Sequence, residues 1–92
     1  MNTKRDKISI IHEILLLIRS KEGEARPTFI MYKANLSHQM LTEYMNEMMQ
    51  KQMILENISK KGKKTYVITD KGHAFIRDYK VIRNCLDSYG LT

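Results

Sequence analysis

The spacing at which apolar residues recur changes twice along the chain, from helical to strand-like and back to helical. This order limits the folds that the chain can adopt. Apolar residues recur at helical spacing from residue 8 to about residue 52, in three stretches separated by short polar turns. Two runs rich in β-branched and aromatic residues follow at 54–59 and 64–69, and helical spacing then returns until about residue 88. The 92 residues have room for one small core only. The sequence therefore predicts a mostly helical α+β domain with three helices, a β-hairpin and a final helix.

Local signals divide the helical part of the chain. Gly23 ends the first helix, and Pro27 suits the first turn of a short second helix over 27–33. The residues at 34–37, Ala-Asn-Leu-Ser, are typical of a tight turn, and Ser37 can cap a third helix over 38–52. Two helices joined in this way form a helix-turn-helix candidate, and the hairpin that follows predicts a winged helix-turn-helix.

The helix over 38–52 has an apolar side that begins at Leu41 and a polar side that is the first candidate functional surface. The polar side carries Gln39, Thr42, Glu43, Asn46 and Gln50. Gln39 and Asn46 have the paired donor and acceptor that match an adenine edge in the major groove, and Thr42 can contact a base or a thymine methyl. The acidic residues Glu43 and Glu47 count against such contacts. Base recognition and an ordinary hydrated helix face therefore both stay open.

The hairpin tip is the second candidate surface, because four lysines surround its Gly62. These are Lys60, Lys61, Lys63 and Lys64. Sixteen Lys and Arg against ten Asp and Glu give a net charge of +6, which favours a polyanionic partner, nucleic acid before a membrane surface. Such a cluster can follow a phosphate backbone, although basic hairpin tips also serve solubility. Arg26 and Lys33 are expected to add phosphate contacts.

The last helix carries apolar residues at alternating spacings of four and three, which is the pattern of a coiled-coil seam. They are Phe75, Tyr79, Ile82, Leu86 and Tyr89. The outer members need a cover, and the same helix of a second copy would provide it in a two-fold dimer. We therefore divide the chain into a winged helix-turn-helix DNA-binding domain at 1–70 and a C-terminal dimerisation helix at 71–92. The single cysteine, Cys85, is expected to be a small buried residue near this interface.

Catalytic and membrane signals are weak. The chain has no glycine-rich phosphate loop and no metal-binding histidine pair, and its three histidines, His12, His38 and His73, are scattered. We expect no enzyme, no metal or other cofactor and no small-molecule substrate. The apolar run at 8–18 is too short to span a bilayer and is interrupted by polar residues. We expect a cytoplasmic protein associated with the chromosome.

Two segments resemble a known family. They are Met-Tyr-Lys-Ala-Asn-Leu-Ser at 31–37 and Tyr-Val-Ile-Thr-Asp-Lys-Gly at 66–72, which leads into Phe75 and Ile76. With them, almost the whole chain resembles the small archaeal winged-helix DNA-binding proteins of the Sulfolobus ten-a chromatin-protein type. The resemblance implies a homodimer joined by an antiparallel coiled coil of the C-terminal helices, with winged domains that bind duplex DNA. It also implies DNA-facing positions for Ser37, His38, Gln39, Thr42 and the hairpin lysines.

The chain departs from that family's pattern at two places. Gln52 stands where a glycine is expected after the third helix, and a left-handed backbone there would cost about 1 kcal/mol, so this helix is expected to end differently. The last helix stops near Gly90, which limits a coiled coil to about 28 Å.

The sequence thus predicts a homodimeric duplex-DNA-binding protein, either a transcriptional regulator or a nucleoid-associated protein. One alternative is a protein-interaction module without DNA binding, in which the acidic residues of the helix over 38–52 face the partner. Another is an RNA-binding protein, which exposed stacking aromatics would support. Tyr32, Tyr44 and Tyr66 are instead expected in the core or at its edge.

Overall fold

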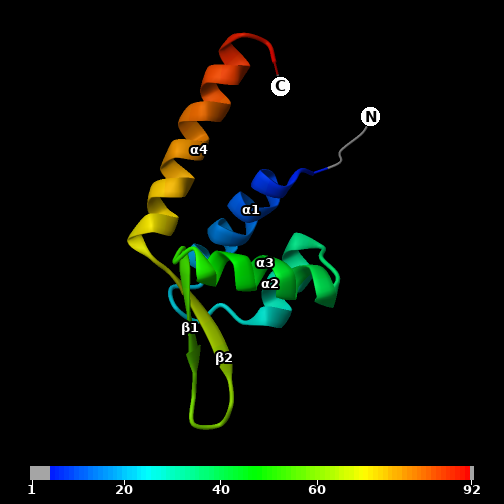
Figure 1. Ribbon diagram of the computed structural model, residues 1–92, viewed down its shortest axis with the longest axis vertical. Helices are drawn as coiled ribbons and strands as arrows, with labels where there is room; N and C mark the ends of the chain where they lie inside the picture. Colours follow the sequence, from blue (N-terminus) through cyan, green and yellow to red (C-terminus); the bar gives the residue numbers. More distant parts are fainter. Residues whose placement is uncertain (1–4, 92) are drawn as a thin grey trace.

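The computed structural model describes residues 5–91, which form four helices and one two-stranded antiparallel sheet in the expected order (Figure 1). The elements are α1 (Lys7–Ser20), α2 (Pro27–Ala34), α3 (His38–Gln50), β1 (Ile54–Ile58), β2 (Lys64–Ile68) and α4 (Asp70–Ser88). Residues 1–4 and 92, the outer ends of the two predicted units, lie outside the described residues. The order and pairing of the elements confirm the winged helix-turn-helix fold, and the hairpin is its wing.

Polar side chains and left-handed residues set the helix ends. Ser37 caps α3 by accepting a hydrogen bond from the Met40 N–H at 3.1 Å, as the sequence predicts. Asn35 ends α2 in the left-handed conformation with φ 55°. Gln52 also adopts a positive φ, 63°, after α3. The expectation that this helix ends differently is therefore wrong, and the chain accepts the strain of a left-handed residue there.

The core lies between the helices and the inner face of the wing, with α1 passing through its centre. The largest fully buried side chains come from α1, α2, α3 and β1, and they are Ile14, Leu15, Ile18, Ile30, Met48 and Ile54. α1 supplies three of them and packs against α2, α4 and β2, which makes it the central element of the core. This packing fixes the rotation of α3, whose Leu41, Met45 and Met48 are all buried.

The base of the wing is anchored on both edges of β2. β1 and β2 pair from Ile54 opposite Ile68 to Ile58 opposite Lys64. On the other edge of β2, the Tyr66 N–H donates to the Ala25 carbonyl at 2.9 Å. The tip of the wing projects away from the body (Figure 1). The base of the wing is therefore fixed to the domain, while its tip stands in solvent.

α4 begins inside the domain and then leaves it. Its buried residues, Gly72 and Ile76, are both in its first two turns, and its far half extends away from the wing (Figure 1). Ile82 and Tyr89 are 57% and 75% exposed, so the cover that their spacing predicts is not supplied by this protomer. Phe75 packs against the core, and the Tyr79 ring stacks on the His12 ring with 4.0 Å between the ring centroids. The dimer itself stays a prediction.

Two expectations about burial are wrong. Tyr32 is 84% exposed, because the core side of the short helix α2 is taken by Ile30 and Ala34 and residue 32 points the other way. Cys85 is exposed on the far half of α4, so this protomer does not bury it, and its place near the proposed dimer interface stays a prediction.

Candidate nucleic-acid interface

The polar face of α3 is exposed as predicted. Gln39, Thr42 and Asn46 all lie on the solvent side of the helix. The Thr42 hydroxyl donates to the His38 carbonyl at 3.0 Å, which leaves its lone pairs as acceptors. The Gln39 amide donates to Glu43 Oε2 at 3.3 Å. Asn46 makes no side-chain hydrogen bond with any described residue, so its amide keeps both donor and acceptor for a ligand.

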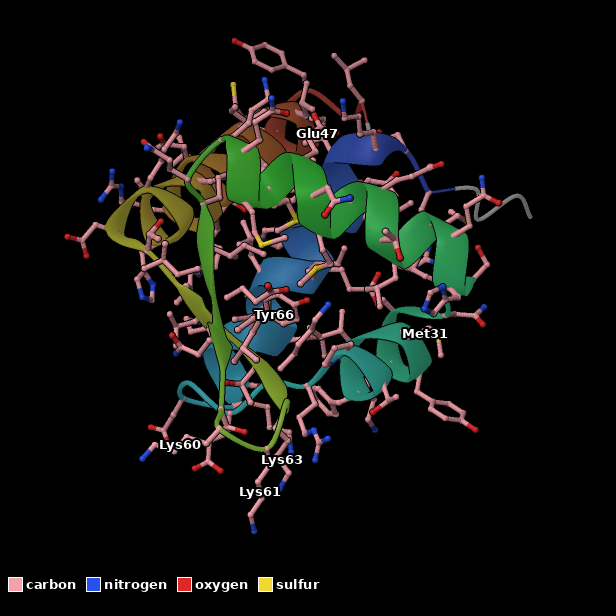
Figure 2. The ribbon with its side chains drawn as sticks, turned by 60° about the horizontal axis from the view of Figure 1, so that its bottom comes forward. Met31, Glu47, Lys60, Lys61, Lys63 and Tyr66 are labelled. Atoms are coloured by element: carbon pink, nitrogen blue, oxygen red, sulfur yellow. The ribbon has the colours of Figure 1, made fainter. Side chains whose placement is uncertain are left out.

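One of the two acidic residues of α3, Glu47, has its charge balanced by a lysine of α1. Glu47 forms an ion pair with Lys7 at the start of α1, at 2.8 Å, and the Glu47 carboxylate raises the pKa of the Lys7 ammonium. Figure 2 shows Glu47 on the opposite side of α3 from the wing lysines. One of the two acidic charges that counted against DNA binding is therefore balanced within the protomer.

The wing presents its lysines on a well-defined turn. Lys60, Lys61 and Lys63 are exposed at the tip (Figure 2). The Ser59 hydroxyl accepts hydrogen bonds from the Lys61 and Lys63 N–H groups, at 3.3 and 3.1 Å, and Gly62 adopts φ 80°. The turn thus holds the backbone of these lysines in place while their side chains reach into solvent.

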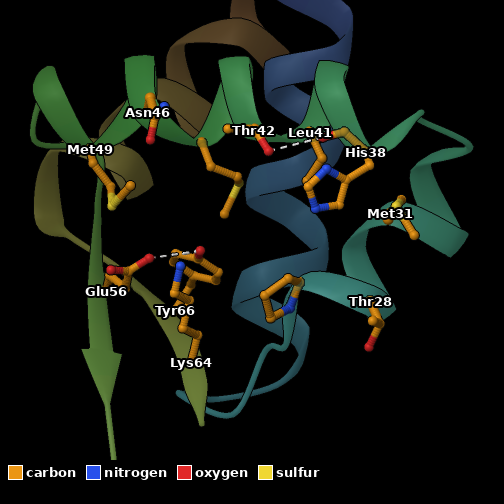
Figure 3. Close-up of a pocket in the computed structure, with 12 residues that line it drawn as sticks. Thr28, Met31, His38, Leu41, Thr42, Asn46, Met49, Glu56, Lys64 and Tyr66 are labelled. Atoms are coloured by element: carbon orange, nitrogen blue, oxygen red, sulfur yellow. Dashed lines mark hydrogen bonds between the residues drawn. The ribbon is translucent and has the colours of Figure 1, made fainter. Parts of the chain in front are cut away.

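A groove joins the polar face of α3 to the wing. It is lined by Thr42 and Asn46 of α3, by Lys64 and Tyr66 of β2 and by Glu56 of β1 (Figure 3). Its volume is about 240 Å³. The remaining lining is mainly apolar and comes from α2 and α3: Pro27, Thr28, Met31, His38, Leu41, Met45 and Met49.

Inside the groove, Tyr66 and Glu56 form a hydrogen-bonded pair. The Tyr66 hydroxyl donates to Glu56 Oε2 at 2.9 Å (Figure 3). Burial, together with the Glu56 carboxylate, raises the pKa of the phenol, so the hydroxyl keeps its proton. Sequence reasoning did not select Glu56. The signal that could have found it is strand alternation, since Glu56 lies opposite Tyr66 and on the same side of the sheet.

The other predicted contact residues lie on α2 and at the start of α3. Arg26 is the exposed N-cap of α2 and makes no side-chain capping bond, and Lys33 is exposed in the last turn of the same helix. Ser37 and His38 are exposed at the start of α3, where the Ser37 hydroxyl oxygen is occupied by its capping role.

Within residues 5–91, no group of three His, Cys, Asp or Glu side chains is arranged to hold a metal ion. Over the same part of the chain, no helix combines the length and apolar character needed to cross a membrane.

Several solved structures share this fold. Sso10a-2, a DNA-binding protein from Sulfolobus solfataricus, is 22% identical with a TM-score of 0.74, covering 94% of this chain and 90% of that chain. MepR, a transcription regulator of the Staphylococcus aureus multidrug efflux pump MepA, is 12% identical with a TM-score of 0.72, covering 87% of this chain. This chain spans only 59% of MepR. A MepR–DNA complex is also similar, with 12% identity and a TM-score of 0.67, covering 87% of this chain and 58% of that chain.

A search of curated protein sequences found no match. The similar structures named above are described as a DNA-binding protein and a transcription regulator. The family model described as winged helix-turn-helix matches residues 4–87, which is most of the chain. The protein therefore belongs to the winged helix-turn-helix family.

Proposed function

We propose that this protein is a homodimeric duplex-DNA-binding protein, a transcriptional regulator or a nucleoid-associated protein, with α3 in the major groove and the wing on the phosphate backbone. The observation that carries the proposal is that Thr42 and Asn46 of α3 and Lys64 of the wing line the same groove. Side chains suited to base edges and side chains suited to phosphates are therefore neighbours on one face.

The distribution of charge supports the same placement. The tip lysines extend the face beyond Lys64, and Arg26 and Lys33 add exposed cations on α2. Glu47 is paired with Lys7 on the other side of α3, so its charge is directed away from the proposed DNA. The DNA-binding description of Sso10a-2 and the DNA complex of MepR agree with this use of the fold.

Dimerisation through α4 is the second part of the proposal. Ile82 is 57% exposed and borders an apolar hollow between α1 and α4 that Ile8 and Leu86 also line. The α4 helix of a second copy, running antiparallel, would cover these side chains. The 19 residues of α4 give a contact of about 28 Å at most. If the two α3 helices are then about 34 Å apart, they can enter successive major grooves.

The test is the binding of a fluorescent random-sequence duplex across a salt series. If all eight wing lysines of a dimer contact phosphate, the log-log salt slope is about −7, and replacing all four lysines per protomer by glutamine flattens it. Two double variants that lose equal charge separate the effect of the wing from that of overall charge. They are Lys60→Gln/Lys61→Gln on the wing and Arg77→Gln/Lys80→Gln on α4. We expect the wing pair to reduce the slope by up to about 4 and the α4 pair to leave it unchanged.

Two outcomes would contradict the proposal. An equal effect of the wing and α4 pairs would mean that overall charge, not the wing, holds the DNA. No binding at low salt would transfer the proposal to the protein-interaction alternative, in which the wing lysines can be replaced without loss of function.

Tyr32 supports a second candidate, RNA binding. Its ring is 84% exposed beside Lys33, and an exposed aromatic next to a cation suits stacking on an unpaired base. The same salt series with a single-stranded RNA tests this candidate. Tyr32→Ala should weaken RNA binding and leave duplex DNA binding unchanged, whereas RNA binding that does not respond to this variant removes Tyr32 as its support.

A further inference from the structure

We propose that the groove between α3 and the wing binds an aromatic heterocycle that carries an exocyclic amine, as amine-bearing nucleobases do. Its volume of about 240 Å³ lies just below the range of roughly 300–1,000 Å³ that is usual for sites of drug-sized ligands. The groove therefore suits one small ring system and not a long chain. It opens to solvent, so that a sugar attached to the ring can remain outside.

The walls of the groove favour an aromatic ligand. Met31, Met45 and Met49 approach it from α2 and α3, and Met45 is 3% exposed while the other two are half-buried. Figure 3 shows Met49 and Met31 at opposite ends of the cavity. Thioethers make favourable contacts with aromatic rings and adapt to their shape. Three of them around one cavity provide a polarisable surface for a flat ring.

The polar groups favour a ligand that has both donors and acceptors. One oxygen of Glu56 accepts the Tyr66 hydroxyl, and the other lone pairs of the carboxylate can accept from an amine. Asn46 can donate and accept, and its amide has no hydrogen bond with any described residue. The amide matches the amine and ring nitrogen of adenine, and a carboxylate accepts from an exocyclic amine.

The charge in the groove argues against a phosphate as its occupant. Glu56 and Lys64 are the carboxylate and the ammonium among the lining residues, and their formal charges cancel. The half-buried Glu56 carboxylate would repel a phosphate placed inside the groove. Glu56 would therefore make no favourable contact with a DNA backbone. An amine-bearing ring, in contrast, can donate a hydrogen bond to the Glu56 carboxylate.

Binding here would compete with the proposed DNA contact, and this step alone rests on the proposed function. Thr42 and Asn46 belong both to the groove and to the polar face of α3. A ring held against Asn46 would occupy the amide that would otherwise meet a base edge. The protein would then release duplex DNA in response to the ligand.

The test is a titration of the full chain with adenosine, followed through the methyl signals of the methionines by NMR. We expect the signals of Met31, Met45 and Met49 to shift at millimolar adenosine. Purine riboside, which lacks the amine, should bind at least fivefold more weakly. Glu56→Gln replaces a charged acceptor by a neutral one and should weaken adenosine binding about fivefold. The matched control is Glu24→Gln, an exposed glutamate before α2, which should have no effect.

A second variant guards against a change of fold in the groove. Asn46→Ala removes an exposed amide that makes no internal hydrogen bond, and it should also weaken adenosine binding. Weaker adenosine binding in both Glu56→Gln and Asn46→Ala, with the other resonances unchanged, supports the proposal. Methionine signals that do not move, or a response that is independent of the amine and of Glu56, would overturn it.

A further arm separates the two sources of such a ring. A duplex with one unpaired adenine is compared with the fully paired duplex, in the wild type and in Glu56→Gln. Preference for the unpaired adenine that depends on Glu56 assigns the groove to a base within a strand, and adenosine binding without that preference assigns it to a free nucleoside. Adenosine binding is measured without DNA, so a failure of duplex binding does not affect it.

Discussion

Replacing Gly72 by alanine tests how closely α4 is held to the wing. A Cβ at this position would lie 2.5 Å from the Met53 carbonyl oxygen and 2.6 Å from Ile68 Cγ1. The carbonyl cannot rotate aside as a side chain can, and it accepts hydrogen bonds from the Thr69 N–H at 3.1 Å and the Thr69 hydroxyl at 2.9 Å. Alanine therefore has to push α4 away from the start of β1 and stretch both bonds.

The expected loss of stability follows from two opposing terms. Overpacking a close contact costs about 1–3 kcal/mol, and a clash with backbone belongs at the upper end. Alanine recovers about 1 kcal/mol through its higher helix propensity. The net loss is then about 2 kcal/mol, which lowers the Tm of a domain of this size by roughly 8–16 °C. Thermal unfolding followed by circular dichroism measures it, at one fixed protein concentration because of the proposed dimer.

Gly62→Ala is the matched control. Gly62 has φ 80° at the wing tip, and a Cβ added there would have nothing within 4 Å, so alanine meets only the cost of a left-handed backbone, about 1 kcal/mol. We expect Gly62→Ala to lower the Tm about half as much as Gly72→Ala. A Tm that rises in Gly72→Ala would refute the packing argument, because it would mean that the contacts relax without penalty.

Three further predictions concern other parts of the fold. Gln52→Gly removes the strain of φ 63° at a small cost in chain entropy, so chemical unfolding should show a gain of about 0.5–1 kcal/mol; a loss would show that the Gln52 side chain stabilises the turn. Ile82→Asp places a charge on the exposed side of α4, and light scattering should report a monomer with unchanged helix content; a persistent dimer would move the interface elsewhere. Burial and the nearby Arg19 lower the pKa of His12 in the folded protein from its usual 6.5. As the pH drops below about 6.5, His12 takes up a proton in the unfolded chain before it does so in the folded protein, so the free energy of unfolding should fall. His12→Gln should abolish that fall, and a wild-type stability that does not change with pH would contradict the prediction. The lowered pKa of Asp6 affects stability only below its usual value of 3.8, outside this pH range.

Much of the fold could be predicted because its boundaries depend on neighbouring residues. Ser37 caps α3 with its own side chain, and Pro27 begins α2. Gly62 supplies the positive φ of the wing turn. Each of these signals acts over a few positions, so the sequence displays it directly. The end of α3 was less predictable, because the cost of a left-handed Gln52 suggests another ending, yet the chain adopts that conformation where it reverses into β1.

The candidate site was only partly predictable, because its missing members depend on contacts distant in sequence. Period-two alternation puts Glu56 and Tyr66 on one face of the wing, yet only the way the sheet packs shows that this face meets α3. The Lys7–Glu47 ion pair joins residues 40 positions apart. Tyr32 was misplaced because an eight-residue helix has too few turns for its apolar side to be fixed by periodicity alone.

The internal hydrogen bonds of α3 bear on how much sequence discrimination the proposed DNA contact can provide. Gln39 is partly engaged with Glu43, and the Thr42 hydroxyl donates to the helix backbone. Asn46 is then the amide that lines the groove and makes no hydrogen bond with any described residue. One good bidentate contact discriminates by about 1–3 kcal/mol, or about 2–6 kcal/mol in a dimer. That lies at or below the roughly 4–10 kcal/mol that separate specific from non-specific binding in typical sequence-specific proteins. The wing lysines add affinity but no discrimination. If Asn46 is the one base-reading amide of each protomer, the proposed DNA contact fits a nucleoid-associated protein better than a regulator of a few defined sites.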